Sequence, residues 1–197
     1  MKEAERTPAA ASLEGVSLDI RGASILSDIT LQVLQGEKWV VLGPNGSGKT
    51  SLLRLLSGFG YPSRGEMEVL GHSFGHADLR ALRRRVGWAH GDLAAEPPLL
   101  LLDEPCPGLD PLAREGFLES LGALFRNRPD LTVISVTHYV EEIIERYDRM
   151  LLMTDGRVAA QGRLQEVLGS AVISLMYGER CRVDRRDGRY TMRFARR

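Results

Sequence analysis

The sequence predicts an α/β domain with a mostly parallel sheet between layers of helices. Apolar, β-branched runs alternate along the chain with segments of helical periodicity, which is typical of strand-helix-strand units. Two of these runs, residues 99–102 and 131–136, are almost entirely apolar. Such runs favour strands that are covered on both faces, as in parallel sheets.

The N-terminal part of the chain is predicted to be mainly β-structure. Residues 1–11 are expected to be a flexible tail. Residues 16–20 and 29–33 are rich in aliphatic residues and are separated by the Arg21-Gly22 turn, so they predict strands of an antiparallel β-subdomain. An apolar strand at 39–42 follows.

The rest of the chain alternates helices with strands. We expect helices from Lys49 to near Gly58 and over residues 78–85, 112–125, 140–147 and from 164 onward, and strands over residues 66–71, 86–90, 99–102, 131–136 and 149–153. Residues 179–197 are predicted to form a C-terminal hairpin around an Asp-Gly turn.

Composition excludes several classes of function. The 26 Lys and Arg residues balance the 26 Asp and Glu residues, so no overall field attracts nucleic acid or anionic lipid. No apolar run approaches the ~20 residues that cross a bilayer. The two cysteines, Cys106 and Cys181, form no Cys-x-x-Cys pair. We expect a cytoplasmic protein with no nucleic-acid partner.

The most informative segment is a glycine-rich turn between the strand at 39–42 and the helix from Lys49. It reads Gly43, Pro44, Asn45, Gly46, Ser47, Gly48, Lys49 and Thr50, followed by Ser51. Glycines allow the backbone N–H groups to curl around an anion, and the helix start adds unpaired N–H groups. Lys49 is predicted to contact the outer phosphates of a nucleoside triphosphate, and Thr50 to bind Mg²⁺.

A second set of polar residues follows the apolar strand at 99–102. Asp103 and Glu104 come directly after it, and the carboxyl ends of parallel strands are where such sheets bind ligands. Asp103 is predicted to hold Mg²⁺ opposite Thr50. Glu104 is predicted to polarise the attacking water as a general base.

These motifs together resemble the ATP-binding cassette (ABC) family of ATP-binding subunits. Residues 43–50 are similar to its Walker A motif, and residues 99–104 to its Walker B motif with the catalytic glutamate. Asp110 is similar to the D-loop aspartate, and His138 to the switch histidine. The resemblance covers nearly all of residues 12–178, and residues 39–42 and 83–88 resemble ATPases grouped with iron-complex and molybdate importers.

The resemblance implies a RecA-like P-loop NTPase core that binds ATP and Mg²⁺. It assigns catalysis to Glu104, His138 and Lys49, and cofactor binding to the residues of the turn together with Asp110. It also implies transmembrane permease partners, a head-to-tail homodimer, and a place in the cytoplasm at the inner face of the membrane.

One feature of the family pattern is missing. Family members carry a helical subdomain between the Walker motifs, opened by a glutamine and closed by a Leu-Ser-Gly-Gly-Gln signature. Here residues 51–102 alone separate the two motifs, no glutamine lies between Gln35 and Gln161, and the gap falls near residues 90–93. Residues 56–60 resemble a signature but end the first helix, and His90 is a weak substitute for the glutamine.

Three functions are therefore compatible with the sequence. The first is an ABC-type ATPase subunit that energises a membrane transporter. The second is a soluble ABC ATPase that acts outside transport. The third is a truncated, non-hydrolysing nucleotide-binding protein, because the signature normally supplies N–H donors to the partner's γ-phosphate and loss of one such donor costs ~10²–10³ in rate.

Three further side chains have weaker interpretations. Arg21 is a candidate to stack on the adenine base, since residues 19–24 contain no aromatic residue. Cys106 is interpreted as an inert turn residue. The arginines of residues 182–190 are interpreted as a solvated face of the hairpin.

Overall fold

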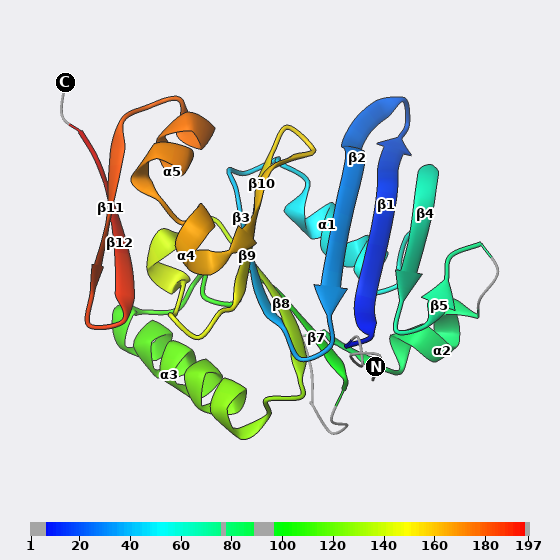
Figure 1. Ribbon diagram of the computed structural model, residues 1–197, viewed down its shortest axis with the longest axis horizontal. Helices are drawn as coiled ribbons and strands as arrows, with labels where there is room; N and C mark the ends of the chain where they lie inside the picture. The colour runs from blue at the N-terminus through cyan, green and yellow to red at the C-terminus, as the bar shows by residue number, and fades with distance from the viewer. Residues whose placement is uncertain (1–6, 76–77, 89–96, 196–197) are drawn as a thin grey trace, which may run out of the picture.

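A computed structural model describes residues 7–75, 78–88 and 97–195 of the protein. It contains a large central sheet, an antiparallel sheet formed by the N-terminal part, and a small C-terminal hairpin (Figure 1). In the part of the chain that the structure describes, no helix is both long and apolar enough to cross a membrane.

The central sheet positions the candidate site. Its strand order is β10-β9-β3-β8-β7-β6. The five parallel members are β3 (Lys38–Leu42), β6 (Val86–Trp88), β7 (Leu99–Asp103), β8 (Thr132–Thr137) and β9 (Arg149–Thr154). The edge strand β10 (Arg157–Arg163) is antiparallel to β9. The predicted mostly parallel sheet is confirmed.

The second sheet has strand order β2-β1-β4-β5, and its pairs are antiparallel, as predicted for the N-terminal β-subdomain. Its members are β1 (Ala9–Ile20), β2 (Ala23–Leu34), β4 (Arg64–Val69) and β5 (His72–Ser73). The predicted tail over residues 1–11 is wrong at its end. Ala10 and Ala11 are buried, and Ala11 pairs with both Val33 of β2 and Val69 of β4. The two neighbouring strands thus satisfy the backbone hydrogen-bonding groups of this segment.

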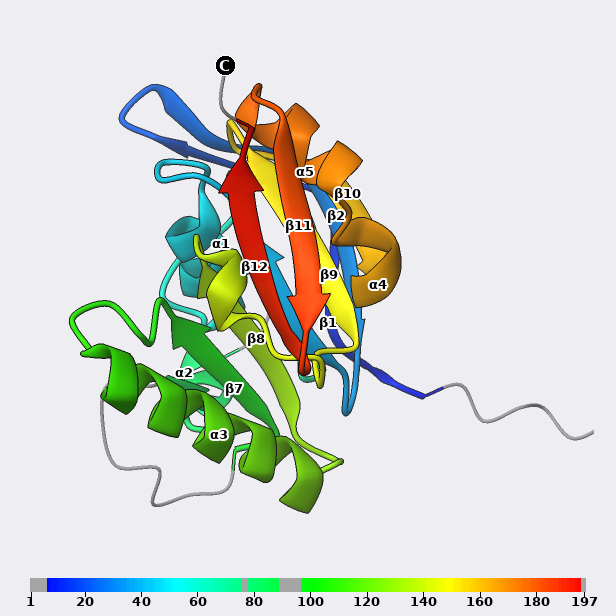
Figure 2. The same ribbon diagram turned by 90° about the vertical axis from the view of Figure 1, so that its left-hand side faces the viewer.

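The helices and the hairpin complete the fold. They are α1 (Lys49–Leu56), α2 (Leu79–Arg83), α3 (Pro111–Asn127), the 3₁₀ turn η1 (Val140–Glu142), α4 (Leu164–Val167), α5 (Ser170–Tyr177), β11 (Cys181–Arg186) and β12 (Arg189–Phe194). Figure 2 shows α3 along one side of the sheet and the β11–β12 hairpin crossing in front of it.

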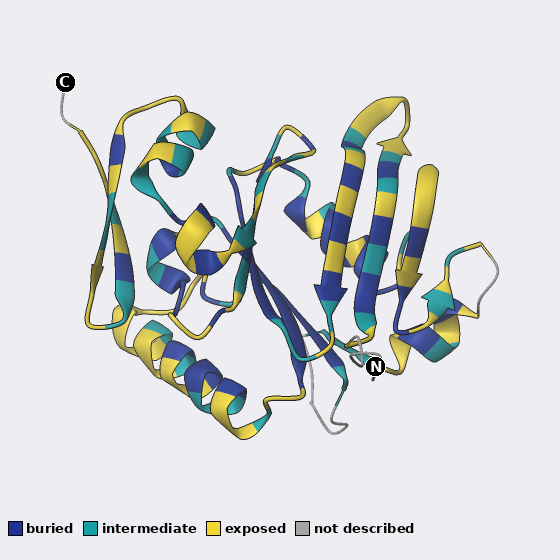
Figure 3. Cartoon of the chain, viewed as in Figure 1, coloured by how far each residue is buried: buried dark blue, intermediate teal, exposed yellow. Residues whose placement is uncertain are grey.

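Two hydrophobic cores cover the two faces of the central sheet. One is built around α1 and the inner face of the N-terminal sheet, and the other around α3, α5 and the hairpin. Alternate residues of β7 serve the two cores: Leu99 and Leu101 face the first, and Leu100 and Leu102 the second. Figure 3 shows the central strands buried almost throughout, as their apolar runs predict.

The predicted helix over residues 140–147 is wrong. Only the single turn η1 forms there, and Ile143 already has an extended backbone (φ −81°, ψ 117°). Ile144 instead forms a β-bridge with Arg189 of the C-terminal hairpin. Pairing with a distant segment therefore overrides the helical periodicity. Residues 86–88 of the predicted strand over 86–90 form β6. Residues 89 and 90, and with them His90 and the gap near residues 90–93, lie outside the described residues.

The predicted C-terminal hairpin is present. Asp187 and Gly188 both have positive φ, 50° and 73°, as the two central residues of a tight type I′ turn require. Arg182 and Arg186 are exposed as predicted, and Arg182 pairs with Asp184 at 2.7 Å. Arg185 and Arg189 instead form ion pairs with Glu145 and with Glu115 of α3.

A candidate nucleotide-binding site

A pocket of about 770 Å³ opens where α1 begins and β7 ends. Its lining residues come from β2, the glycine-rich turn, α1 and the segment after β7: Ile25, Asn45, Gly46, Gly48, Lys49, Thr50, Ser51, Asp103, Glu104 and Pro107. Eight of these are candidate site residues from the sequence, located before α1, in its first turn, or directly after the strand at 99–102. The other two, Ile25 and Pro107, are additions from the structure.

The glycine-rich turn has the backbone conformation that its residues predict. Gly46 and Gly48 have φ of 80° and 93°, which side-chain-bearing residues rarely adopt. At Gly43 the reason for glycine is space, since a Cβ atom there would lie 2.2 Å from the carbonyl oxygen of Met153. The turn is therefore fixed both by local backbone geometry and by contact with β9.

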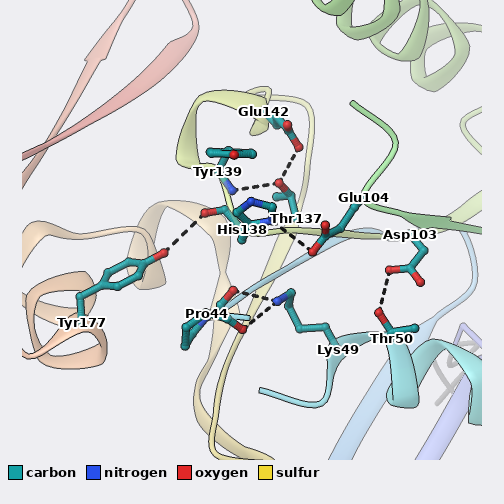
Figure 4. A network of polar contacts seen from close by, with 11 residues as sticks. Pro44, Lys49, Thr50, Asp103, Glu104, Thr137, His138, Tyr139, Glu142 and Tyr177 are labelled. Atoms are coloured by element: carbon teal, nitrogen blue, oxygen red, sulfur yellow. Dashed lines mark hydrogen bonds and ion pairs between the residues drawn. The ribbon is translucent and has the colours of Figure 1, made fainter. Parts of the chain in front are cut away.

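Lys49 lies beneath this turn and is 5% exposed. Its Nζ donates hydrogen bonds to the carbonyl oxygens of Gly43 and Pro44, both at 2.9 Å (Figure 4). Burial lowers the pKa of Lys49, while the nearby carboxylates of Glu104 and Asp103 act to raise it. The ammonium group is thus desolvated and held at the base of the turn, where it strengthens the attraction for an anion.

Thr50 and Asp103 face each other across the pocket. The Thr50 hydroxyl donates to Oδ1 of Asp103 at 3.2 Å. Burial raises the pKa of Asp103, and the hydrogen bond from Thr50 opposes that rise. The two residues that the sequence predicts for Mg²⁺ binding are thus brought into direct contact from α1 and β7.

These residues fit Mg²⁺ only together with ligands from outside the chain. Across residues 7–75, 78–88 and 97–195, no three His, Cys, Asp or Glu side chains gather as a metal site. Mg²⁺ usually takes one or two protein ligands and completes its shell with water and phosphate oxygens. A hydroxyl and a carboxylate beside an anion-binding turn match that requirement.

One buried polar atom at the turn has no partner. Ser47 is 2% exposed, and its Oγ forms no hydrogen bond within the described part of the chain. A buried hydroxyl without a partner is costly. Together with the positive φ of Gly46 and Gly48, this hydroxyl is compatible with a turn that takes an anion from outside the chain.

Glu104 lines the pocket beyond Asp103, and His138 lies behind Glu104. Nδ1 of His138 lies 3.1 Å from Oε1 of Glu104 (Figure 4). Glu104 is not glycine and yet has φ of 46°, a conformation that costs energy and is common at functional sites. Its N–H donates to the carbonyl oxygen of Val136 at 3.0 Å, which fixes the end of β7 against β8. The structure thus brings together two residues that are 34 positions apart.

Other predicted site residues lie outside the pocket lining. Gly43, Pro44 and Ser47 form the layer beneath it, and His138 reaches it only through Glu104. Asp110 is exposed and caps α3, with Oδ1 accepting from the Ala113 N–H at 2.9 Å. Within one chain, the structure therefore gives Asp110 the role of a helix cap.

The N-terminal hairpin contributes to the pocket through a different residue from the one predicted. Arg21 lies in the exposed β1–β2 turn with φ of 51° and does not line the pocket. Ile25, four residues later on β2, does. Ile25 is half-buried next to the buried Leu26, and no motif in the sequence marks it as a pocket residue.

Cys106 is buried beside the segment after β7. Burial raises its pKa to about 11, so the thiol is protonated and a poor nucleophile at neutral pH. This agrees with its interpretation as an inert residue.

Comparison with known proteins identifies the family. A family model for ABC transporters matches residues 26–97. The aliphatic sulfonates import ATP-binding protein SsuB 3 of Rhodococcus jostii is 33% identical over 202 residues, which cover 78% of this chain and 74% of that protein. The chain belongs to the ABC transporter ATP-binding protein family.

Two further matches show how much of this ABC protein aligns with related chains. YlmA, an uncharacterized ABC transporter ATP-binding protein of Bacillus subtilis, is 29% identical over 236 residues, covering 84% of this chain and 89% of the relative. That alignment is longer than the 197 residues of this chain, so the relative has residues with no counterpart here. The structure of cbiO1 from Clostridium perfringens, part of the cbiONQ transporter complex, has a TM-score of 0.71 at 20% identity, covering 84% and 92% of the two chains, and supports the fold alone.

Proposed function

We propose that this ABC protein binds Mg-ATP in the pocket at the start of α1. The observation that carries the proposal is the arrangement of three groups: the Lys49 ammonium beneath the turn, and the Thr50–Asp103 pair across from it. In this proposal the N–H groups of residues 43–50 and Lys49 hold the triphosphate. Thr50 and Asp103 hold Mg²⁺, which neutralises charge on the phosphate oxygens.

Glu104 and His138 have separate roles in the proposal. Glu104 is the general base that orients water, and His138 contacts the γ-phosphate and steadies Glu104 through its imidazole. Asp110 is proposed to approach nucleotide only across a dimer. As an ATP-binding subunit, the protein would then energise a transporter whose transmembrane subunits are other chains.

We further propose that the isolated chain binds ATP but hydrolyses it at a rate close to background. The chain between Ser51 and Trp88 forms α1, β4, β5, α2 and β6, which are all elements of the two sheets or their helices. The residues that YlmA has in addition are therefore proposed to fall between β6 and β7, where the family's signature segment belongs. Without that segment the γ-phosphate lacks preorganised donors from a partner, and each lost donor costs ~10²–10³ in rate.

Calorimetry with Mg-ATP tests the binding proposal, and the chain provides a matched control. Lys38 and Lys49 are both buried lysines that donate to two backbone carbonyls and have pKa values lowered by burial, but Lys38 lies at the opposite end of β3. Lys49→Ala should remove the binding heat, whereas Lys38→Ala should keep it. A wild-type protein with no heat at millimolar Mg-ATP contradicts the proposal.

Release of phosphate tests turnover. The wild type, Lys49→Ala and Glu104→Gln are compared at saturating Mg-ATP. We expect the three rates to be nearly equal and close to background. A wild-type rate well above that of Glu104→Gln would contradict the proposed loss of turnover and would favour an active ATPase.

A further inference from the structure

The segment that carries His138 has few hydrogen bonds of its own. We call residues 137–144 the switch loop. Its internal backbone bonds are those of η1, from the Glu142 N–H to Tyr139 O at 3.3 Å and from the Ile143 N–H to Val140 O at 3.1 Å. A loop with so little regular structure takes its shape from the residues that pack around it.

On its inner side the switch loop is held by a buried carboxylate. Glu142 is 6% exposed, and its Oε2 accepts a hydrogen bond from the Thr137 hydroxyl. The same hydroxyl oxygen accepts from the Tyr139 N–H at 3.0 Å (Figure 4). These two bonds fix the residues directly before and after His138.

On its outer side the switch loop is held by the C-terminal unit, residues 170–194. The Met192 N–H of β12 donates to Oε1 of Glu141 at 3.1 Å. The Tyr177 hydroxyl at the end of α5 donates to the carbonyl oxygen of His138 at 3.5 Å (Figure 4). The bridge between Ile144 and Arg189 adds a third connection at the end of the loop.

The two adjacent carboxylates are therefore bonded to different elements. Glu141 is bonded to the hairpin, and Glu142 to Thr137 at the end of β8. A shift of β12 would move Glu141 and, through the peptide bond, Glu142 and Thr137. His138 lies between these anchors, and its imidazole is 3.1 Å from Glu104.

We propose that the C-terminal unit positions His138 against Glu104, with Glu141 and Tyr177 as the positioning residues. This rests on the proposed function, in which His138 contacts the γ-phosphate. Neither residue lines the pocket, so each acts on the nucleotide site only through the switch loop. A misplacement of ~1 Å at a reacting group can lower the reaction rate by ~10²-fold. A movement of the hairpin would therefore change the position of His138 and, with it, the rate at the nucleotide site.

The test follows the imidazole signals of His138 by nitrogen-detected NMR. The chain has four histidines, and His138→Gln assigns the signal. In Glu141→Ala and in Tyr177→Phe we expect the His138 signal of the free protein to move, and its shift on addition of Mg²⁺ and the slowly hydrolysed analogue ATPγS to become smaller. Glu141→Gln should restore the wild-type signal, because the amide oxygen still accepts the Met192 N–H.

Glu119→Ala is the matched control, since it removes an exposed glutamate of α3 that takes no part in the switch loop. Its His138 signals should match the wild type. Thermal unfolding verifies that each variant is folded, and Tyr177→Phe keeps the test usable if Glu141→Ala unfolds. Unchanged His138 signals in folded Glu141→Ala and Tyr177→Phe overturn the positioning. Absence of wild-type heat with Mg-ATP overturns the proposed function instead, and the signals of the nucleotide-free protein still decide the positioning.

Discussion

The phosphate-binding turn and the switch loop contribute to one candidate site but are stabilised in different ways. Residues 43–50 are shaped by their own glycines and by the helix that starts at Lys49, with one close approach to Met153. The switch loop is shaped by Thr137 on one side and by a hairpin some fifty residues later on the other. Local sequence therefore sets most of the geometry of the first region, with one contact from β9, whereas distant contacts set that of the second.

The largest effect is expected where the turn has no space. In Gly43→Ala the new Cβ would lie 2.2 Å from the Met153 carbonyl oxygen and 2.8 Å from Ser47 Oγ. Backbone atoms cannot yield cheaply, so we expect the free energy of unfolding to fall by about 3 kcal/mol and ATP binding to be lost. Gly46→Ala is the control, because nothing lies within 4 Å of its Cβ position and only its positive φ costs about 1 kcal/mol. Equal urea midpoints for the two variants would contradict the close approach.

The buried carboxylate of the switch loop should give a pH-dependent effect. Burial raises the pKa of Glu142, so the folded chain holds this proton more tightly than the unfolded chain does. The resulting stabilisation is fully present below the unfolded pKa of ~4.3 and is lost as the pH rises through the folded pKa. Glu142→Gln carries no charge to bury, so the wild type should lose unfolding free energy relative to this variant as the pH rises toward neutral.

Urea unfolding at a series of pH values measures that difference. Glu119→Gln, an exposed position on α3, is the control and should give a constant difference from the wild type. If the Glu142→Gln difference is also constant, the carboxylate is not desolvated in solution, and the switch loop is looser on its inner side than the structure indicates.

The role of Asp110 in the structure is local, like that of the residues in the glycine-rich turn. Its carboxylate caps α3 at 2.9 Å from the Ala113 N–H. Asp110→Ala should lower the free energy of unfolding by about 1 kcal/mol, and Asp110→Ser should retain most of the stability. ATP binding by the monomer should be unchanged in both when measured by calorimetry. A loss of binding heat in folded Asp110→Ser would place Asp110 at the nucleotide within one chain.

The smallest effect is expected on the outer face of the hairpin. Arg182 pairs with Asp184 but is 80% exposed, and such pairs contribute less than about 0.5 kcal/mol. Arg182→Ala should therefore leave the thermal midpoint and the His138 signals almost unchanged. A clear change in the His138 signals would show that residues on the exposed face of the hairpin, and not only Met192 of β12, influence the position of His138.

The parts of the fold that follow local rules were predictable. The apolar runs at 99–102 and 131–136 are buried strands, the Asp187-Gly188 turn closes a hairpin, and the Thr50–Asp103 contact joins two motifs that both end at the same sheet edge. In the strands and the turn, neighbouring residues impose one backbone conformation or one burial pattern. The Thr50–Asp103 contact joins residues 53 positions apart, but it follows from the rule that ligand-binding groups gather at the carboxyl ends of parallel strands.

Three features were decided only by tertiary structure. Residues 140–147 have helical periodicity, but Ile144 pairs with Arg189 and leaves one 3₁₀ turn. Ile25 rather than Arg21 reaches the pocket, since the N-terminal sheet packs beside α1 through β2. Residues 9–11 join a strand because Ala11 finds partners on both sides, at Val33 and Val69.

Local sequence rules account for the glycine-rich turn, for the two acids at the end of a buried strand, and for the alternation that produces a parallel sheet. Local sequence could not determine the shape of the switch loop or the ion pairs that Arg185 and Arg189 form with Glu145 and Glu115. Those depend on free energies of contact between segments far apart in the chain, which local propensity does not contain. For this protein, local sequence specifies the glycine-rich turn, whereas contacts with the C-terminal unit surround the loop that carries His138.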